Sequence, residues 1–514
     1  MTTTADPWHT IVIGSGMGGM SCAAALSHFK HKVLLLEQAA EVGGLTHSFS
    51  RGGWNWDVGL HYLGEHAQGG LAGPLLGWLC DGAIRMASTG PVYDTLHFPE
   101  GFEFMIARPE EAFKAELKER FPESAKGIDA FFPAMRDAQH AGHHVFAHRG
   151  MPEPVAAVSK LVFHRSLQKW CGRTTQQVLD DLFDNPKIKA VLSAQWGDYG
   201  GPPAVGSFAM HALIIREYFQ GAYYPEGGAG VIAPAMVRVI TGAGGEVKTG
   251  ATVDSLIMED GVVKGVRTAD GGEYRADRVV SNIGALNTVL KLLPPALHDS
   301  AWAKEVLSFP PSVAHVSLYL GFEGDIASNG ATRSNHWVYE TWDPGSARWD
   351  DPAHTDPPVC FISFPSLKDP KYEPGPSRKH TGEVAVFCAW EPFARFAGAR
   401  TEALQQEYQS LKQEIERKVL AAFARQFPAL VPMIKHRELA TPLATVAYTG
   451  AYHGAFYGLE TTPRRFQSPA LNARTPVTGL YMSGQDVGSP GINGAMWGGV
   501  MCAGAIEPRV FQRI

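Results

Sequence analysis

The hydrophobic positions near the N-terminus follow a strand, turn, helix, strand pattern. Residues 10–13 (TIVI) form a short apolar run that predicts a strand, and residues 32–37 (KVLLLE) predict a second one. Between them, residues 17–29 are small and compatible with a helix. Small side chains allow such a helix to lie close to a sheet, as a nucleotide-binding unit requires. The pattern therefore predicts a βαβ unit.

The rest of the chain changes pattern several times. Residues 76–224 predict mainly helices, interrupted by proline and glycine. Residues 246–281 alternate apolar and polar positions and predict strands joined by hairpin turns at EDG and ADGG. A strand-rich stretch (SVAHVSLYLGF) follows, and then a charged helix at residues 401–425, which we expect to be a solvated outer helix. The last part, from TPVTGLYM onward, predicts a strand, a glycine-rich turn and a helix of small residues.

The turn after the first strand matches the dinucleotide-binding pattern G-x-G-x-x-G with Gly14, Ser15, Gly16, Met17, Gly18 and Gly19. Gly14 permits the tight turn, Gly16 lets the backbone approach a pyrophosphate, and Gly19 allows close helix packing. The helix N-terminus would face the phosphate charge. Glu37, at the end of the second strand, would accept hydrogen bonds from an adenosine ribose and would disfavour the 2′-phosphate of NADP. These features together predict dinucleotide binding, and the alternative is an ordinary βα turn.

Two further segments distinguish FAD from NAD by resemblance. Glu41-Val42-Gly43-Gly44 and Asp57-Val58-Gly59-Leu60-His61 follow the second predicted strand, and the chain closes with GLYMSGQD (479–486) and GINGA (491–495). These segments resemble the FAD-dependent amine oxidase and phytoene desaturase superfamily. The resemblance implies that Asp486 binds the ribityl and pyrophosphate region and that the last helix begins under the flavin. It also implies that the backbone of Val253 contacts adenine, although a valine there could equally serve core packing.

The cofactor implied by this resemblance is FAD. The residues that it assigns to FAD binding are Gly14, Ser15, Gly16, Met17, Gly18, Gly19, Glu37, Gln38, Gly43, Gly44, Leu45, Gly59, Leu60, His61, Val253, Gly484, Asp486, Gly491, Ile492, Asn493 and Ala495.

Three longer segments resemble one branch of that superfamily. Residues 196–230, 448–458 and 479–499 are similar to retinol saturase and its bacterial relatives, which are neighbours of the carotenoid isomerases and phytoene desaturases. The resemblance implies an α/β fold with a discontinuous Rossmann-like FAD-binding domain and an interleaved α+β substrate domain. At 514 residues the chain is long enough for two domains. The expected FAD-binding domain comprises residues 1–75, 225–300 and 440–514, and the substrate domain residues 76–224 and 301–439.

The implied activity is saturation of a C=C bond in a hydrophobic polyene or unsaturated lipid. Desaturation and cis-trans isomerisation on the same scaffold stay open as alternatives, and so do an amine oxidase and a flavin-binding protein without turnover. A reduced flavin supplies the hydride, so the protein needs to supply positioning and an acid. Accordingly, the sequence contains no G-x-S-x-G motif of a serine hydrolase.

A saturase needs a proton donor near the flavin, whereas an isomerase needs no net donor. The candidates are His61, His211, Tyr223, Tyr448, His453 and Tyr457, each of which could instead be a core or lining residue. An electron source is also required. No second G-x-G-x-x-G follows a strand, so NAD(P)H would bind transiently or another protein would deliver the electrons.

The net charge and the composition disfavour some classes of binding partner. The net charge is −6 and no basic run of five residues occurs, which disfavours nucleic acid as a partner. Six cysteines without a C-x-x-C pair are expected to be reduced and mostly buried. His140, His144 and His148 would share a helix face, but Gly142 weakens that helix, so we predict no metal site.

The expected location is cytoplasmic. The N-terminal residues lack the pattern of a secretory signal, and no run of 18 apolar residues occurs. Residues 152–172 combine apolar side chains with Lys160, Arg165 and Lys169, as a helix lying on a membrane surface would. This segment is the candidate for peripheral membrane contact, and the alternative is a helix packed on the substrate domain.

Overall fold

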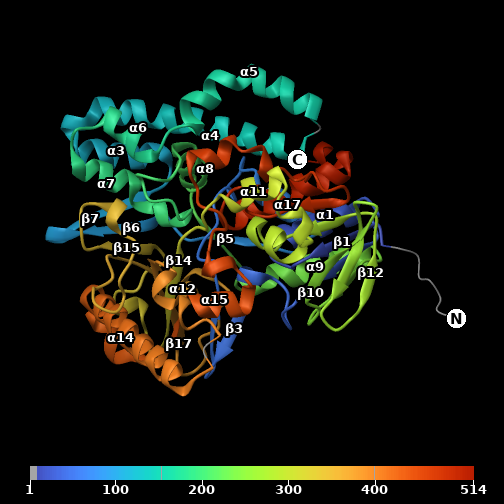
Figure 1. The fold of residues 1–514 in the computed structure, drawn as a ribbon. Coiled ribbons are helices and arrows are strands. Elements are labelled where there is room, and N and C mark those ends of the chain that lie inside the picture. The colour runs from blue at the N-terminus through green and yellow to red at the C-terminus, as the bar shows by residue number, and fades with distance from the viewer. Residues whose placement is uncertain (1–7, 152, 399, 514) are drawn as a thin grey trace.

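A five-stranded parallel sheet brings the two ends of the chain together (Figure 1). The structure is a computed structural model that describes residues 8–151, 153–398 and 400–513. The strand order is β19-β13-β1-β2-β9, and every neighbouring pair is parallel. The strands are β1 (Thr10–Ile13), β2 (Val33–Leu36), β9 (Glu246–Lys248), β13 (Val279–Ser281) and β19 (Leu480–Met482). The βαβ unit predicted from the sequence is therefore confirmed.

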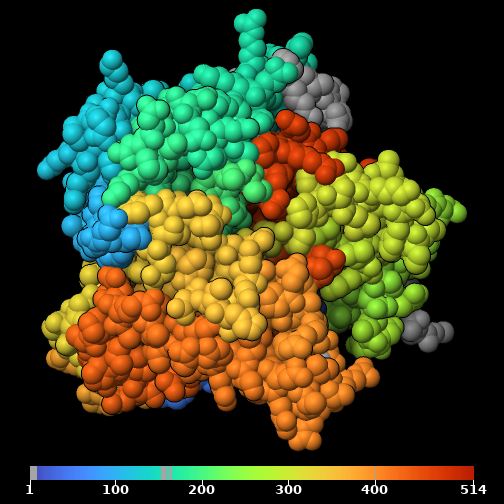
Figure 2. All heavy atoms as spheres, turned by 60° about the vertical axis from the view of Figure 1, so that its left-hand side comes forward, coloured from blue at the N-terminus to red at the C-terminus, as the bar shows by residue number. Residues whose placement is uncertain are grey.

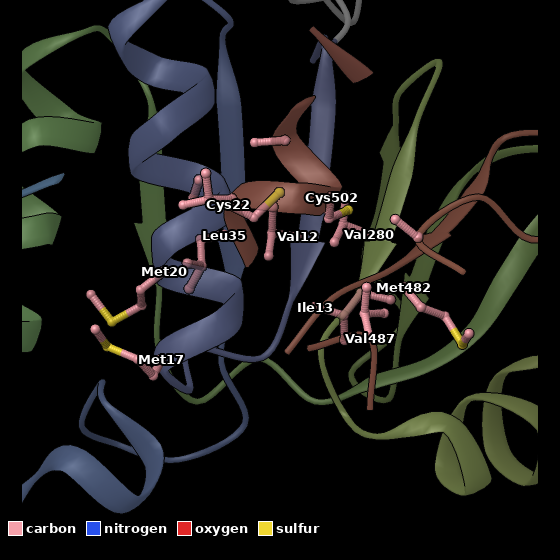
Figure 3. Close-up of a cluster of buried hydrophobic side chains, with 14 of the residues drawn as sticks. Val12, Ile13, Met17, Met20, Cys22, Leu35, Val280, Met482, Val487 and Cys502 are labelled. Carbon is pink, nitrogen blue, oxygen red and sulfur yellow. The ribbon is translucent and has the colours of Figure 1, made fainter. Parts of the chain in front are cut away.

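Helix α1 (Met17–His28) packs against β1 and β2 of this sheet, and α9 (Ile232–Gly242) packs against β9. Both α9 and α17 (Gly491–Ile506) pack against α1. The approach of α1 to α17 is close, because a Cβ added at Gly499 would lie 2.1 Å from the Gly18 carbonyl oxygen. Buried side chains from both helices and from β1, β2 and β13 form one cluster (Figure 3). The N-terminal and C-terminal segments thus share a core.

Residues 253–275 form a separate antiparallel sheet of three strands, β10 (Val253–Glu259), β11 (Val262–Thr268) and β12 (Glu273–Arg275). The predicted hairpin turns EDG and ADGG join these strands, so this prediction is confirmed.

A second large sheet of seven strands has the order β18-β14-β17-β16-β15-β6-β7. Its strands are β6 (Val92–Phe98), β7 (Phe102–Ala107), β14 (Ala314–Glu323), β15 (Asn335–Tyr339), β16 (Val359–Ser363), β17 (Lys379–Cys388) and β18 (Ile434–Ala440). The long helix α14 (Glu402–Gln426) forms where the sequence predicts it. The helix has the expected solvated outer face, since most of its residues are exposed or half-buried, while Ile415, Val419 and Phe423 are buried in the same cluster as strand residues of this sheet.

The helical segment lies at the top of Figure 1, above this sheet. It comprises α3 (Glu110–Arg120), α4 (Ala125–Gly150), α5 (Glu153–Cys171), α6 (Thr175–Leu182), α7 (Pro186–Ser193) and α8 (Phe208–Arg216). The prediction of a mainly helical segment at 76–224 is incomplete, because β6 and β7 also belong to it. These two strands form a local antiparallel hairpin, and β6 also pairs in parallel with β15, more than two hundred residues away.

Shorter elements connect these parts. The strand pairs are β3 (Ser48–Arg51) with β4 (Trp54–Asp57) and β5 (Met86–Ser88) with β8 (Tyr223–Pro225). The remaining α-helices are α2 (Ala72–Leu79), α10 (Ala285–Asn287), α11 (Ala301–Leu307), α12 (Pro365–Lys368), α13 (Glu391–Ala394), α15 (Pro442–Thr449) and α16 (Pro463–Gln467). No helix in the described part of the chain is long and apolar enough to cross a membrane. All six cysteines are free and buried.

We propose the division into domains that the sequence predicts, and the two large sheets support it. All strands of the five-stranded sheet come from residues 1–75, 225–300 and 440–514. The seven-stranded sheet takes its strands from the remaining segments, with β18 ending at the boundary. In Figure 2 the blue-to-green and yellow-to-orange segments adjoin, and the yellow-green segment lies beside them.

Candidate functional site

A cavity of about 1490 Å³ extends from the five-stranded sheet to the seven-stranded sheet. Single-ligand pockets usually measure about 300–1,000 Å³, so this one has room for a dinucleotide and a second molecule. We call the part around the first βαβ turn the glycine end, lined by Gly14, Gly16, Gly18, Glu37 and Gly484. The part toward the seven-stranded sheet is the acid end, and it is lined by Tyr62, Asp198, Glu217, Tyr218, Phe361 and Tyr457.

The glycine end is shaped by close backbone contacts. A Cβ at Gly18 would lie 2.3 Å from the Gly484 Cα, and one at Gly19 would lie 2.1 Å from the Gly14 carbonyl oxygen. Gly14 also has a φ of +92°, which favours glycine. Helix α1 begins beside the cavity, with no side-chain cap and no acidic residue in its first turn. Its first N–H groups are therefore suited to an anion such as a pyrophosphate.

Glu37 is buried and fixed at the end of β2. Its Oε2 accepts hydrogen bonds from the Ser15 backbone N (2.8 Å) and hydroxyl (2.6 Å), and its Oε1 accepts one from the Ala39 N (2.8 Å). These donors hold the carboxylate at the cavity wall, where it fits the predicted role of binding a ribose. Ser15 itself lies behind this wall and supports Glu37.

Asp486 connects two loops of the cavity wall. Its Oδ2 accepts a hydrogen bond from the Ala285 N (2.8 Å), and its Oδ1 accepts one from the Leu459 N (2.9 Å). The Arg465 guanidinium lies 3.8 Å from the same Oδ1. Asp486 therefore organises the backbone around the cavity, a role that the sequence did not reveal.

Most of the predicted cofactor residues come together in the cavity wall. Those that line it are Gly14, Gly16, Met17, Gly18, Glu37, Gln38, Gly43, Gly44, Leu45, Gly59, His61, Val253, Gly484, Asp486, Gly491, Ile492, Asn493 and Ala495. Ser15, Gly19 and Leu60 are not among the lining residues.

The predicted proton donors divide into two groups. His61, Tyr448 and Tyr457 line the cavity. Burial, followed by the charge of Lys368, lowers the pKa of His61 to about 3, so His61 is neutral and a weak acid at pH 7. Tyr448 is 68% exposed, whereas Tyr457 is buried.

His211, Tyr223 and His453 lie outside the cavity wall, which argues against them as proton donors. His211 is fully buried, with its Nδ1 3.2 Å from the Tyr199 hydroxyl, and burial lowers its pKa to about 3. Tyr223 belongs to β8, and its ring contacts His66. His453 stacks on Tyr452, with ring centroids 3.9 Å apart. Side-chain type alone could not separate these residues from the cavity wall.

The sequence interpretation missed two acids at the acid end. Asp198 Oδ2 lies 2.9 Å from the Tyr62 hydroxyl, and Glu217 Oε2 accepts a hydrogen bond from the Asn493 side chain (2.8 Å). Burial, as the largest cause, raises the pKa of both carboxyls well above the usual range. The only available signal was their location within residues 196–230, the segment that resembles the saturases.

A buried lysine lies behind the acid end. The Lys368 Nζ donates hydrogen bonds to the His61 carbonyl (2.9 Å), the Ser363 hydroxyl (2.7 Å) and the Asn335 side chain. Burial lowers the pKa of Lys368 to about 7, against the raising effect of Asp94 and Glu383. Lys368 is not among the lining residues, so it acts on the site through its neighbours.

The histidines weighed as metal ligands lie on α4, which forms despite Gly142. Among the described residues, no group of three or more His, Cys, Asp or Glu side chains is arranged to hold a metal ion.

Comparison with known proteins identifies a family, two relatives and a solved structure. Residues 17–506 match the family model of flavin-containing amine oxidoreductases. The chain is 31% identical to all-trans-retinol 13,14-reductase of Rattus norvegicus over 97% of this chain and 85% of that protein. It is 24% identical to the chloroplastic prolycopene isomerase of Daucus carota over 96% of this chain and 79% of that protein. Among solved structures, cyclohexylamine oxidase from Brevibacterium oxydans has the same fold, with a TM-score of 0.61 at 16% identity and coverage of 98% of this chain and 99% of that one.

Proposed function

Because this chain belongs to the family of flavin-containing amine oxidoreductases, and is thus an FAD-dependent enzyme, we propose that it saturates a C=C bond of a hydrophobic polyene. The proposal rests on one observation: the cavity continues from the glycine end into the acid end. The acid end is lined by the aromatic residues Tyr62, Tyr218, Phe361 and Tyr457. Aromatic walls suit a flat conjugated chain, and the acids there suit a proton transfer. The similarity to a retinol reductase over most of the chain supports the same assignment.

The glycine end would hold FAD in a defined direction. The pyrophosphate would lie at the N-terminus of α1, the adenosine ribose at Glu37, and the adenine beside Val253. Reduced FAD supplies the hydride for such a reaction. The chain itself then has to orient the polyene, exclude water and supply one proton.

The test is an anaerobic reaction of the reduced holoenzyme. The enzyme is reduced with dithionite or, in a second series, with NADPH, and is then mixed with all-trans-retinol or with a carotenoid. We expect the flavin to be reoxidised and the product to gain the mass of two hydrogens. Reduction by NADPH would support transient nicotinamide binding, and its failure would favour a protein that delivers electrons. A polyene that never gains hydrogen would contradict the proposal.

Isomerisation is the second candidate, and the similarity to prolycopene isomerase favours it. An isomerase returns the substrate with unchanged mass and altered double-bond geometry. The same reaction mixture therefore distinguishes the two activities by mass and by chromatographic retention.

We further propose that α5 contacts a membrane surface at the cytoplasmic face, through which a hydrophobic substrate would enter. Val158, Leu161 and Val162 are 65%, 80% and 69% exposed, and their spacing places them on one helical face. Arg165 and Lys169 continue that face and would meet anionic lipid headgroups. Residue 152 and the side chain of Lys160, both part of the predicted segment, lie outside the described residues, as do several other α5 side chains.

Vesicle flotation tests this contact. We expect the protein to float with anionic phosphatidylserine vesicles, and the double variant Leu161→Glu/Val162→Glu to stay in the soluble fraction. Val205→Glu changes an exposed valine elsewhere and serves as the matched control. Equal flotation of both variants would contradict the role of α5.

A further inference from the structure

Tyr62 stands between two carboxyl groups at the acid end. Its hydroxyl oxygen lies 2.9 Å from Asp198 Oδ2 and 3.0 Å from Asp94 Oδ2. A tyrosine hydroxyl has only one hydrogen to donate. It can therefore donate to one of the two acids, and the other acid must carry a proton and donate to the tyrosine oxygen. The geometry alone requires one protonated carboxyl in this group.

The hydrogen-bond partners indicate which acid holds the proton. Asp94 also accepts hydrogen bonds from the Gln195 side-chain amide and, at 3.2 Å, from the Asn335 amide. Several donors stabilise a carboxylate. Asp198 has Tyr62 as its only side-chain hydrogen-bond partner in the part of the chain that the structure describes. Asp94 is thus the carboxylate, and Asp198 is the protonated acid.

The electrostatics agree with this assignment. Burial raises the pKa of Asp94 to about 6, while hydrogen bonds and the charge of Lys368 oppose the rise. For Asp198, burial and the nearby Asp94 both raise the pKa, which lies well above the usual range. The proton therefore belongs on Asp198 at neutral pH.

The position of Asp198 makes this proton available to a bound molecule. Asp198 and Tyr62 line the cavity, whereas Asp94 does not. The Tyr218 ring packs edge-on against Tyr62, with centroids 4.5 Å apart, and helps to form an aromatic wall beside the acid. A polyene at the acid end would thus meet the acidic hydrogen of Asp198 beside an aromatic wall.

We propose that Asp198 is the proton donor of the saturation, held in its protonated form by Tyr62 and Asp94. The inference rests on the proposed function. In the reaction the π bond of the alkene breaks, and one carbon forms a C–H bond with the hydride that the reduced cofactor supplies. The O–H bond of Asp198 breaks as its proton forms the C–H bond at the other carbon. The alkene is reduced by two electrons, the cofactor is oxidised by two, and Asp198 is left as a carboxylate that solvent reprotonates. Tyr62 and Asp94 are positioning residues.

The decisive variant is Asp198→Asn. An amide can donate to the Tyr62 oxygen as the carboxylic acid does, so this change preserves the hydrogen bond and removes only the acid. Infrared spectroscopy of the resting holoenzyme provides a readout that does not depend on turnover. Because Glu217 also has a raised pKa, the readout is the difference between the wild type and the variant at pH 7. We expect the wild-type-minus-Asp198→Asn spectrum to contain the C=O stretch of one protonated carboxyl. Asp181→Asn, at an exposed acid on α6, is the control and should give a difference spectrum without this band.

The second readout measures reduction of the flavin and its reoxidation by the polyene separately. We expect dithionite to reduce the flavin of Asp198→Asn at the wild-type rate, and reoxidation by the polyene to slow by about 10²–10⁴-fold, the usual contribution of a general acid. Asp198→Glu should restore part of the rate.

Two results would overturn the assignment. The first is a difference spectrum of Asp198→Asn without the protonated-carboxyl band. The second is reoxidation of Asp198→Asn at the wild-type rate, and if Glu217→Gln slows the reoxidation instead, the other cavity acid is the donor. A wild-type enzyme that no polyene reoxidises would overturn the proposed function as well, so the two failures are distinguishable.

Discussion

The two ends of the cavity are built in different ways. The glycine end consists of backbone groups and glycines, and its central residues Gly14, Gly18 and Glu37 belong to one βαβ unit. The acid end consists of side chains from distant segments, among them Tyr62, Asp198 and Phe361. The first fits a common cofactor closely, and under the proposed function the second supplies a proton to a particular substrate. The residues suited to the cofactor are thus encoded locally, whereas those suited to the substrate meet only when the chain folds back on itself.

Gly18→Ala should have the largest effect at the glycine end. The added Cβ would lie 2.3 Å from Gly484 Cα and 2.6 Å from Asn282 Oδ1, and the Gly484 backbone cannot move aside as a flexible side chain can. We expect a loss of about 3 kcal/mol in stability and loss of bound FAD, measured as the flavin-to-protein absorbance ratio. Gly77→Ala is the matched control, since nothing lies within 4 Å of its added Cβ. A yellow Gly18→Ala protein with wild-type affinity for FAD would contradict this account.

His211 tests whether buried histidines near the acid end serve stability. Burial holds the pKa of His211 at about 3 in the folded state, below its usual value of about 6.5, so unfolding at low pH is accompanied by uptake of a proton. The stabilising contribution is present above pH 6.5 and is lost as the pH falls toward 3. Between pH 7 and pH 4 the wild type should lose about 3 kcal/mol of unfolding free energy from this residue.

The His211→Gln variant should lack this loss when urea denaturation is compared at the two pH values. His354→Gln changes an exposed histidine and should behave as the wild type does. An identical pH dependence for His211→Gln and the wild type would contradict the interpretation. In that case His211 would have to be charged in the folded protein.

The same contrast explains what the sequence could predict. The spacing of Gly14, Gly16 and Gly19, together with Glu37, is short-range information, and the structure places β1, α1 and β2 where the apolar pattern put them. Asp198 and Asp94 are more than a hundred residues apart, and they face each other only because both approach Tyr62. No periodic pattern in the sequence indicates that residues so far apart lie close together in the fold. The histidines and tyrosines chosen from the segments that carry the family resemblance therefore included three that lie outside the cavity wall.

Glu37→Ala should have an intermediate effect at the glycine end. The change leaves the backbone N–H groups of Ser15 and Ala39 without their acceptor and removes the predicted ribose partner. We expect FAD to bind about 30-fold more weakly, which corresponds to about 2 kcal/mol for the loss of a charged hydrogen-bonding group. Titration of the apoprotein with FAD measures the effect. Glu246→Ala, at an exposed acid on the neighbouring strand β9, should leave the affinity unchanged, and equal affinities for the two variants would refute the role of Glu37.

Tyr448→Phe should have the smallest effect. It tests whether a tyrosine near the glycine end takes part in the proton transfer that we propose for the acid end. Tyr448 is 68% exposed and lies two residues before Gly450, where an added Cβ would be 3.0 Å from the Gln38 Nε2 at the glycine end. Loss of an exposed hydroxyl usually changes stability by less than about 0.5 kcal/mol. The rate of polyene reduction should fall by less than about twofold, whereas loss of a proton donor costs about 10²–10⁴-fold. Stopped-flow reoxidation of the reduced flavin measures both cases. A hundredfold slower Tyr448→Phe variant would place the proton source near the glycine end and would remove the distinction between the two parts of the cavity.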